Sequence, residues 1–260
     1  MGEPLGKITG CVITHNEADR IEACLRSMAF CDELLVVDSR STDATRELAA
    51  ACGARVLERD WAGYRSQKQF AIDSATHDWV LFLDADEQAT PELAAQVVEL
   101  RASGTGHAAF RLPFRSIYLG KPLRFGEAAR ESHVRLFDRR RCRFGGFEIH
   151  ESVQVTGSTG RLAGQVLHDS FRSLEHQLDK TARYARLMGA ALHAAGKRAS
   201  WLRLLLNPPL RFLRGYLLRL GLLDGWRGFA VALIDANYVR QKYLHQLVLE
   251  RRAAETDRQR

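Results

Sequence analysis

Short apolar runs alternate with helical patterns along the N-terminal part of the chain, and no other feature restricts the fold as strongly. The apolar runs predict strands at 8–14, 33–39, 54–60 and 79–87. Apolar residues at helical spacing predict helices at 17–29, 41–53 and 64–75, and another helix that begins at Pro91. Regular alternation of strand and helix is typical of a mostly parallel α/β sheet with right-handed crossovers.

The pattern changes after this last helix. Turn signals and alternating residues predict further strands within 108–120, 133–146 and 147–164. Helical patterns cover 171–200 and 225–252. Between them, Pro208 and Pro209 should end one helix and start another, because proline cannot donate a helical hydrogen bond. We therefore expect a sheet domain at 1–170 and a helical region at 171–260.

The charge of the chain is concentrated in this helical region. The formal net charge is +7, but from Phe171 onward 17 Lys and Arg stand against 7 Asp and Glu, whereas residues 1–170 carry 21 against 24. Such polarity indicates an anionic partner, namely a membrane surface, a phosphorylated acceptor or nucleic acid. A solvated helical face is the alternative interpretation.

Cysteine usage and hydropathy bear on the compartment. The five cysteines are odd in number and form no CxxC pair, which favours reduced thiols over a zinc site or a disulfide framework. The first seven residues contain no apolar run typical of a signal peptide. No run of uncharged apolar residues is long enough to span a bilayer. We expect a cytoplasmic protein.

The segment WVLFLDADEQATPEL places Asp84, Asp86 and Glu87 directly after a strand buried on both faces. In open α/β sheets, ligands bind at the carboxyl ends of the strands. Three neighbouring acids repel one another, and a divalent cation such as Mg²⁺ or Mn²⁺ would relieve the repulsion. A simple helix start, with Thr90 as N-cap before Pro91, explains only the residues after the acids.

Polar residues also follow two earlier strands. Asn16 and Glu17 come after the first strand, and Asp38 and Asp43 come with the second. Each has a structural alternative as a turn or helix-cap residue. If the sheet is parallel, however, all these side chains lie at one edge, which is the arrangement that a bound nucleotide requires.

These motifs carry a resemblance. The chain is similar to family 2 glycosyltransferases of the GT-A (Rossmann-like) fold and, within them, to lipopolysaccharide core β-1,4-glucosyltransferases of Gram-negative bacteria. The matching segments run in the family's order and are VITHNEADRIEACLRS, VVDSRSTDATRELA, GYRSQKQFAI, WVLFLDADE, VRLFDRRRCRFGGFEIHESV, LHDSFRSLEHQLDKTARYA and GLLDGWRGFAVALIDANYV. The resemblance implies a catalytic domain at 1–170 and a basic helical C-terminal extension.

The resemblance also implies roles for individual residues. Those implied to bind the donor are Thr14, Asn16, Glu17 and Asp38 at the nucleoside, Lys68 at the base or phosphates, and Asp84 at the ribose or a metal-bound water. Asp86 would be the direct ligand of Mn²⁺ or Mg²⁺, with Asp84 beside it. Arg40 stands where related sequences usually carry glycine, which leaves the backbone angle of this turn open.

The reaction implied is inverting transfer from a nucleotide sugar, for which one carboxylate must accept the acceptor's proton. The first candidate for this base is Glu151, with Glu148 as a second and His150 as a neighbour that orients the base or contacts phosphate. Glu127 and Glu131 compete for the same role. Of the arginines in RLFDRRRCRF, we expect Arg135 to work in the site and the others to be solvated.

The expected donor is a UDP-sugar, with UDP-glucose as a guess by resemblance, and the expected acceptor is a glycolipid. Arginines interleaved with leucines and aromatic residues in 201–219 predict peripheral contact with an anionic membrane, at the cytoplasmic face of the inner membrane. A polyprenyl-phosphate sugar synthase of the same fold remains an alternative, as does a nucleotidyltransferase. A basic nucleic-acid-binding module is disfavoured by the acidic residues 1–170.

Overall fold

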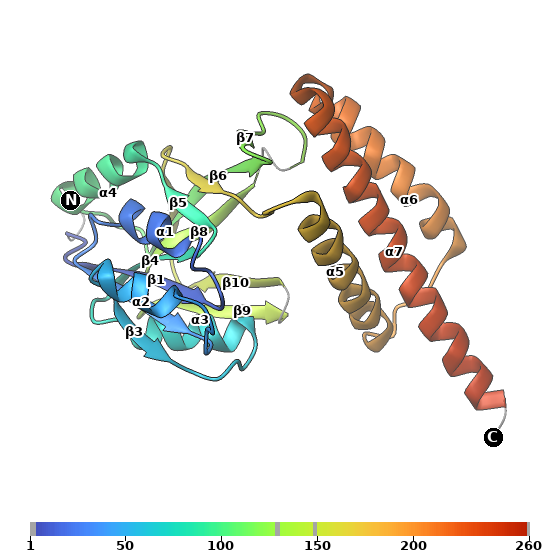
Figure 1. Cartoon of the computed structure of the whole chain (residues 1–260), viewed down its shortest axis with the longest axis horizontal. Coiled ribbons are helices and arrows are strands. Elements are labelled where there is room, and N and C mark those ends of the chain that lie inside the picture. The colour runs from blue at the N-terminus through green and yellow to red at the C-terminus, as the bar shows by residue number, and fades with distance from the viewer. Residues whose placement is uncertain (1–3, 128–130, 148–149, 259–260) are drawn as a thin grey trace. The chain divides into compact units, whose positions relative to one another are not determined.

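The computed structural model describes residues 4–127, 131–147 and 150–258, which form two compact units (Figure 1). The first unit contains the chain up to Arg115 together with Glu131–Asp169. The second contains the segment that begins at Ser116 and the chain from Ser170 onward. We expected the segment after Ser116 to belong with the sheet. It belongs instead with the helices, although it lies far from them in sequence.

The first unit is built on a mixed sheet with the strand order β3-β2-β1-β4-β8-β6-β12-β5. Its strands, with β9 and β10 pairing as a separate hairpin, are β1 (Ile8–Thr14), β2 (Glu33–Asp38), β3 (Arg55–Glu58), β4 (Trp79–Asp84), β5 (Glu87–Ala89), β6 (Ala109–Tyr118), β8 (Ser132–Asp138), β9 (Cys142–Phe147), β10 (His150–Val155), β11 (Thr159–Arg161) and β12 (Val166–His168). Its helices are α1 (Ile21–Ser27), α2 (Thr45–Ala51), α3 (Tyr64–Asp73) and α4 (Pro91–Ser103). Strands β1 to β4 pair in parallel, whereas β8 is antiparallel to both β4 and β6.

Strand β1 shows why the N-terminal strands carry apolar residues on both faces. All of its residues are buried, and its two faces enter different hydrophobic clusters. Ile8 and Val12 belong to one cluster, whereas Cys11 and Ile13 belong to the other. Because side chains alternate along a strand, a strand covered on both faces needs apolar residues at successive positions.

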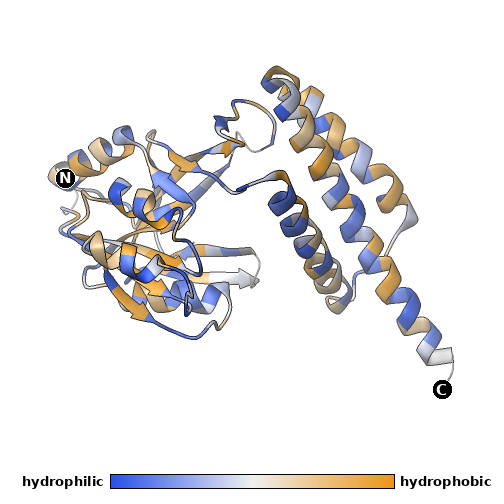
Figure 2. Cartoon of the chain, viewed as in Figure 1, coloured by the Kyte–Doolittle hydropathy of each residue, from blue (hydrophilic) through white to orange (hydrophobic). Residues whose placement is uncertain are grey.

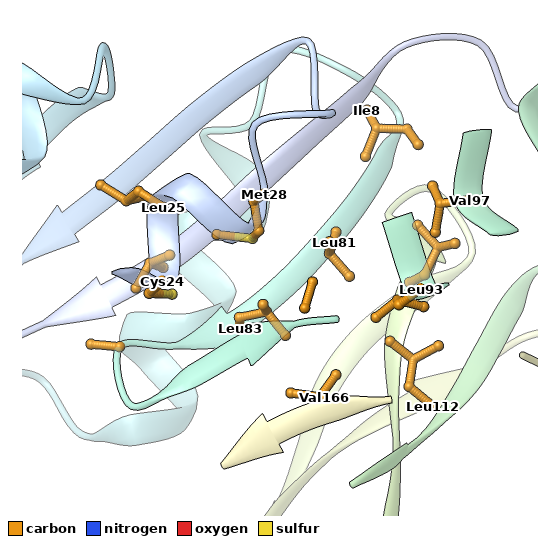
Figure 3. Packing of buried hydrophobic residues seen from close by; sticks show 14 of the residues in the cluster. Ile8, Cys24, Leu25, Met28, Leu81, Leu83, Leu93, Val97, Leu112 and Val166 are labelled. Carbon is orange, nitrogen blue, oxygen red and sulfur yellow. The ribbon is translucent and has the colours of Figure 1, made fainter. Parts of the chain in front are cut away.

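The first of these clusters joins α1 and α4 to the sheet (Figure 3). Cys24 and Leu25 of α1, Met28 directly after it, and Leu93 and Val97 of α4 are all fully buried in it. Helix α4 begins as predicted, with the Thr90 hydroxyl accepting a hydrogen bond from the Leu93 amide and with Pro91 in the first turn. The cap therefore fixes where the chain turns away from the acidic end of β4.

The second unit consists of helices and a short hairpin strand. Its elements are β7 (Lys121–Pro122), α5 (Leu174–Ala194), α6 (Trp201–Leu213), the π-helical turn η2 (Arg214–Leu218), the 3₁₀ turn η3 (Gly221–Asp224) and α7 (Gly225–Arg258). Helix α7 packs against both α5 and α6. The segment from Ser116 is fixed to these helices by buried and backbone contacts. The Tyr118 hydroxyl donates to Gln177 at 2.7 Å, and the Asp224 carboxylate accepts from the Phe125 amide at 2.9 Å.

The expected break at Pro208 and Pro209 is wrong, because α6 continues through both prolines. Contacts with α7 hold the helix on either side of them. The Asn207 amide donates to the Tyr243 hydroxyl at 3.1 Å, and an Arg211 nitrogen lies 3.0 Å from an Asp235 oxygen. Tertiary packing here compensates for the backbone hydrogen bonds that proline cannot donate.

All five cysteines have free thiols, in agreement with the sequence. Within the described residues, no helix is both long enough and apolar enough to cross a bilayer.

A half-buried carboxylate at the amino end of β2 makes stability depend on pH. The Glu33 carboxylate accepts hydrogen bonds from the Thr9 hydroxyl at 2.7 Å, from the Thr76 amide at 2.9 Å and from Arg55 at 2.7 Å. Burial alone would raise the pKa of Glu33, but these donors lower it from 4.5 to about 2. The charged form is therefore stabilised by folding.

We expect Glu33→Gln to lower the free energy of unfolding at neutral pH by about 2 to 3 kcal/mol. Since the folded pKa is depressed, this contribution is complete above the unfolded pKa and disappears as the pH falls from about 5 to about 2. Urea unfolding at neutral and acidic pH measures the difference. The exposed Glu22→Gln serves as the control. An equal difference between wild type and Glu33→Gln at both pH values would contradict the assignment.

Candidate active site

The parallel register brings three predicted residues to one edge of the sheet. Thr14 at the end of β1 is paired with Asp38 at the end of β2, and Ile13 is paired with Asp84 at the end of β4. The Thr14 hydroxyl donates to the Asp38 carboxylate at 2.8 Å. The carboxyl ends of these parallel strands therefore form one polar rim, as expected for a ligand-binding edge.

Asp38 organises the loops of this rim. Its carboxylate is fully buried and accepts hydrogen bonds from the Ser41 amide at 2.7 Å and the Ser41 hydroxyl at 2.5 Å. The Ser41 hydroxyl in turn accepts from the Asn16 amide at 2.8 Å, and Asn16 Oδ1 accepts from the Thr42 amide at 2.8 Å. These bonds join the loops after β1 and β2 into one structure.

Two residues in these loops adopt left-handed backbone angles. Asn16 has a φ of 56° and Arg40 a φ of 58°. Asparagine tolerates this region, whereas a long side chain such as arginine seldom enters it. In this left-handed conformation, the Arg40 guanidinium forms an ion pair with Asp60. The turn therefore keeps the angle that glycine would supply, although arginine occupies the position.

The other residues with predicted or possible roles in these loops lie beside the rim. The Glu17 amide donates to the Thr45 hydroxyl at 2.8 Å. Asp43 accepts from the Ala18 amide at 3.2 Å and from the Thr45 hydroxyl. Asp43 therefore has a structural role at the start of α2. This is the helix-cap alternative that the sequence had left open.

A buried ion network lies at the end of β4. Asp84 Oδ1 is 2.9 Å from Lys68 Nζ, and Asp84 Oδ2 is 3.0 Å from Arg135 Nη2. Arg135 also contacts Glu87 Oε1 at 2.5 Å, while the Asp84 amide donates to Glu87 Oε2 at 3.0 Å. Burial favours the neutral acid, but Lys68 and Arg135 together hold the pKa of Asp84 well below its usual range. Asp84 is thus a charged carboxylate with two cationic partners.

Arg135 is the most buried of the five arginines at the end of β8 and the start of β9. The other arginines, which are half-buried or exposed, are Arg139, Arg140, Arg141 and Arg143. Burial lowers the pKa of Arg135, but the charges of Glu87 and Asp84 raise it above the usual range. The position of Arg135 agrees with the selection of this arginine from the sequence, although its role in the reaction remains a prediction.

Lys68 connects this network to the hairpin formed by β9 and β10. Its ammonium lies 2.7 Å from Glu151 Oε1 as well as 2.9 Å from Asp84 Oδ1. Burial lowers the pKa of Lys68, but the two carboxylates raise it above its ordinary value. One charged lysine therefore contacts both the candidate base Glu151 and Asp84, the first acid of the motif Asp84-Ala85-Asp86, called the DxD motif below.

The second acid of the motif lies beside a histidine that the sequence analysis missed. Asp86 Oδ2 is 3.5 Å from His168 Nε2, and β12 pairs with β5 so that His168 stands opposite Glu87. Burial lowers the pKa of His168, but the hydrogen bond and charge of Asp86 raise it. One oxygen each of Asp86 and Glu87 and one nitrogen of His168 lie within 4.8 Å of one another. His168 ends the run VLH within a segment that carries the family resemblance, and this was the available signal.

The remaining candidates for the catalytic base are placed as follows. Glu148 lies outside the described residues, and His150 lies in β10, where its side chain is not described. Glu131 is exposed in the first unit. Glu127 lies in the second unit with its carboxylate bound by arginines, one of them 2.7 Å away. Among the described carboxylates, Glu151 is therefore the candidate that contacts the DxD network.

Fold and rim together define an α/β protein of the GT-A type, in which acidic side chains stand at the carboxyl ends of parallel strands. Residues 10–145 match glycosyl transferase family 2, and the chain belongs to this family. The resemblance drawn from the sequence motifs is thereby confirmed.

Relatives extend over most of the chain. The lipopolysaccharide core biosynthesis glycosyltransferase LpsC of Rhizobium meliloti is 30% identical over 89% of this chain and 88% of its own length. An uncharacterized glycosyltransferase of Rickettsia prowazekii is 31% identical over 94% of this chain and 88% of its own length. The similarity thus includes the helical unit, beyond the residues that the family description matches.

The fold also matches a solved enzyme. The mannosyltransferase PcManGT of Pyrobaculum calidifontis, solved in complex with GDP-Man and Mn²⁺, superimposes with a TM-score of 0.54 over 95% of this chain and 89% of its own, at 15% identity. This likeness confirms the predicted fold class.

Proposed function

We propose that this family 2 glycosyltransferase moves a sugar, glucose from UDP-glucose in the first instance, onto a hydroxyl of a lipopolysaccharide core or related glycolipid. The observation that carries the proposal is the position of Lys68 between Asp84 and Glu151. Lys68 thereby links Asp84, which we place beside the sugar donor, to Glu151, a carboxylate that can accept a proton. The similarity to LpsC supports the acceptor class.

The donor would lie along the polar rim. Our proposed nucleoside pocket is formed by two strand ends and the loop after β1, which the Ser41 contacts hold together, and its residues are Thr14, Asp38, Asn16 and Glu17. Lys68 would contact the phosphates, and Asp84 the ribose or a metal-bound water. Because Asp38 already accepts protein hydrogen bonds, we assign it mainly to holding the pocket's shape.

The donor set at Asp86 fits a divalent cation. Two carboxylate oxygens and an imidazole nitrogen within 4.8 Å suit Mn²⁺ or Mg²⁺. The Glu87 oxygens are already engaged by Arg135 and by the Asp84 amide, so Asp86 and His168 are the proposed ligands. When bound, the cation would neutralise the charge of the leaving diphosphate. PcManGT, which has the same fold, was solved with Mn²⁺, and this supports the assignment.

Glu151 is the proposed general base. Its carboxylate would accept the proton of the acceptor hydroxyl as the oxygen attacks the anomeric carbon. The bond from that carbon to the diphosphate oxygen breaks in the same step, and its electron pair leaves with the nucleoside diphosphate. A single displacement inverts the configuration. Lys68 would keep the Glu151 carboxylate aimed at the donor before the acceptor arrives.

The acceptor class implies that the enzyme works at a membrane. We propose peripheral contact of the basic helical unit with the anionic cytoplasmic face of the inner membrane. The surplus of Lys and Arg in that part of the chain supports this contact.

Calorimetric titration with UDP-, GDP- and ADP-sugars, each with and without Mn²⁺, tests the donor assignment. We expect one nucleotide to bind, and its affinity to fall at least about tenfold without the cation, because the diphosphate charge is then uncompensated. Heat denaturation with each ligand provides an independent readout through ligand-linked stabilisation. Failure of every nucleotide sugar to bind under both conditions would overturn the proposed function.

A further inference from the structure

Helix α6 presents its leucines to solvent and directs polar residues toward its neighbour. The exposed apolar residues of α6 are Trp201, Leu202, Leu205, Leu206, Leu210 and Leu213. Asn207 and Arg211, by contrast, bond to Tyr243 and Asp235 of α7. A helix that packs on a soluble core shows the opposite arrangement, with its apolar stripe inward. Figure 2 shows hydrophobic segments along α6 and the first part of α7.

The apolar face continues beyond α6. Further exposed residues in η2, η3 and the first turns of α7 are Leu217, Leu218, Leu222, Leu223, Trp226, Phe229 and Leu233. Leu218 is 79% exposed, and Trp226 is 58% exposed. A concentration of exposed apolar residues in neighbouring segments of the chain indicates an interaction site in a soluble protein. Aromatic and leucine side chains beside arginines are the composition of interfacial membrane helices.

A basic hollow adjoins this face between α6 and α7. It is lined by Asn207, Leu210, Arg211, Arg214, Val239, Lys242 and Tyr243. The Lys242 ammonium lies over the Tyr243 ring, 4.6 Å from its centre. Among the described residues, no carboxylate forms an ion pair with Lys242 within 4.0 Å. The lysine therefore adds an uncompensated positive charge to the hollow.

The charges around the hollow leave a positive surplus. The Glu127 carboxylate lies 3.4 Å from an Arg211 nitrogen, 3.1 Å from Arg214 and 2.7 Å from Arg219. Arg211 also pairs with Asp235 at 3.0 Å. Three arginines and a lysine thus face two carboxylates within this cluster. Arg214 is half exposed, so its guanidinium is accessible from outside.

We infer that this hollow binds the phosphate of an anionic lipid headgroup while the surrounding leucines enter the acyl region. Guanidinium and ammonium groups with nearby tyrosine and asparagine donors match phosphate oxygens, and the apolar border matches the chains beneath them. A symmetric contact with a second copy would bring like charges together. The inference deepens the proposed function by naming its membrane partner, but it requires no sugar donor.

Flotation of the full chain with phosphatidylcholine vesicles, with and without phosphatidic acid, tests the inference. We expect wild type to float with phosphatidic acid, and Arg214→Gln combined with Lys242→Gln to weaken binding roughly thirtyfold through the loss of two surface charges. Lys242→Gln alone leaves no carboxylate unpaired, so it should fold normally and lose roughly fivefold. Leu206→Gln with Leu213→Gln, both exposed, should also reduce binding.

The matched control is Arg251→Gln with Arg252→Gln, which removes the same charge from exposed positions of α7. These positions lie about 15 Å along the helix from Lys242, beyond the Debye length of about 8 Å, so binding should stay within about twofold. Equal losses in both double variants would overturn the inference in favour of diffuse attraction. The inference would also be overturned if the wild type did not bind vesicles and instead formed dimers that dissociate in the leucine variants. Donor titration of the same samples reports on the proposed function separately.

Discussion

Replacing Asp86 with asparagine is expected to lower turnover roughly a thousandfold, because an oriented cation at a leaving diphosphate contributes several kcal/mol. The substitution keeps the shape of the side chain but removes the charge that faces His168 at 3.5 Å. We expect the Mn²⁺ dependence of donor binding to disappear as well. Calorimetry with and without Mn²⁺, followed by turnover at saturating donor, measures the two effects separately.

The control for Asp86→Asn lies directly before β4, whereas Asp86 follows the other end of that strand. Asp78 precedes β4, is 46% exposed and pairs with Arg140 on the surface, so Asp78→Asn should leave both quantities unchanged. His168→Gln removes the proposed nitrogen ligand and should weaken Mn²⁺ binding in the same direction as Asp86→Asn. If Asp86→Asn retained metal-dependent donor binding of wild-type strength, Asp86 would not be a ligand.

The strands of the first unit could be predicted because burial on both faces leaves a plain signal. Strands were predicted at 8–14 and 79–87, and the structure gives β1 at the first and β4, which ends at Asp84, at the second. The continuous α6 could not be predicted from local rules, since proline propensity favours a break. Its stability comes from Asn207 and Arg211 contacting α7, which lies far along the chain.

Some features of the candidate site could also be predicted from the sequence, whereas others could not. The convergence of Thr14, Asp38 and Asp84 follows from parallel pairing and could be anticipated from three strand ends. The bridge from Lys68 to Glu151 joins α3 to β10, and no spacing in the sequence encodes such a contact. His168 was missed for a similar reason, because only the antiparallel pairing of β12 with β5 brings it to the acids.

Glu151→Gln is expected to reduce turnover by about two to four orders of magnitude, the range that a positioned general base contributes. Glutamine keeps the size of the side chain and can still accept a hydrogen bond from Lys68, but it cannot take the acceptor's proton. Lys68 also retains Asp84 at 2.9 Å, so the buried network survives the change. Donor affinity should therefore stay close to that of wild type while turnover falls, which a kinetic and a calorimetric measurement resolve.

Glu131→Gln is the control variant for the Glu151→Gln measurement. Glu131 is a competing candidate from the sequence, is 47% exposed and lies 4.0 Å from the His133 ring on the surface, so its variant should remain active. Loss of turnover in Glu131→Gln but not in Glu151→Gln would move the base to Glu131. Full activity in both variants, and in Glu127→Gln and Glu148→Gln as well, would point to an acceptor that is already anionic, such as a polyprenyl phosphate, because a phosphate oxygen has no proton to lose. The set of four glutamate variants thus decides between a hydroxyl acceptor and a lipid phosphate acceptor on the same fold.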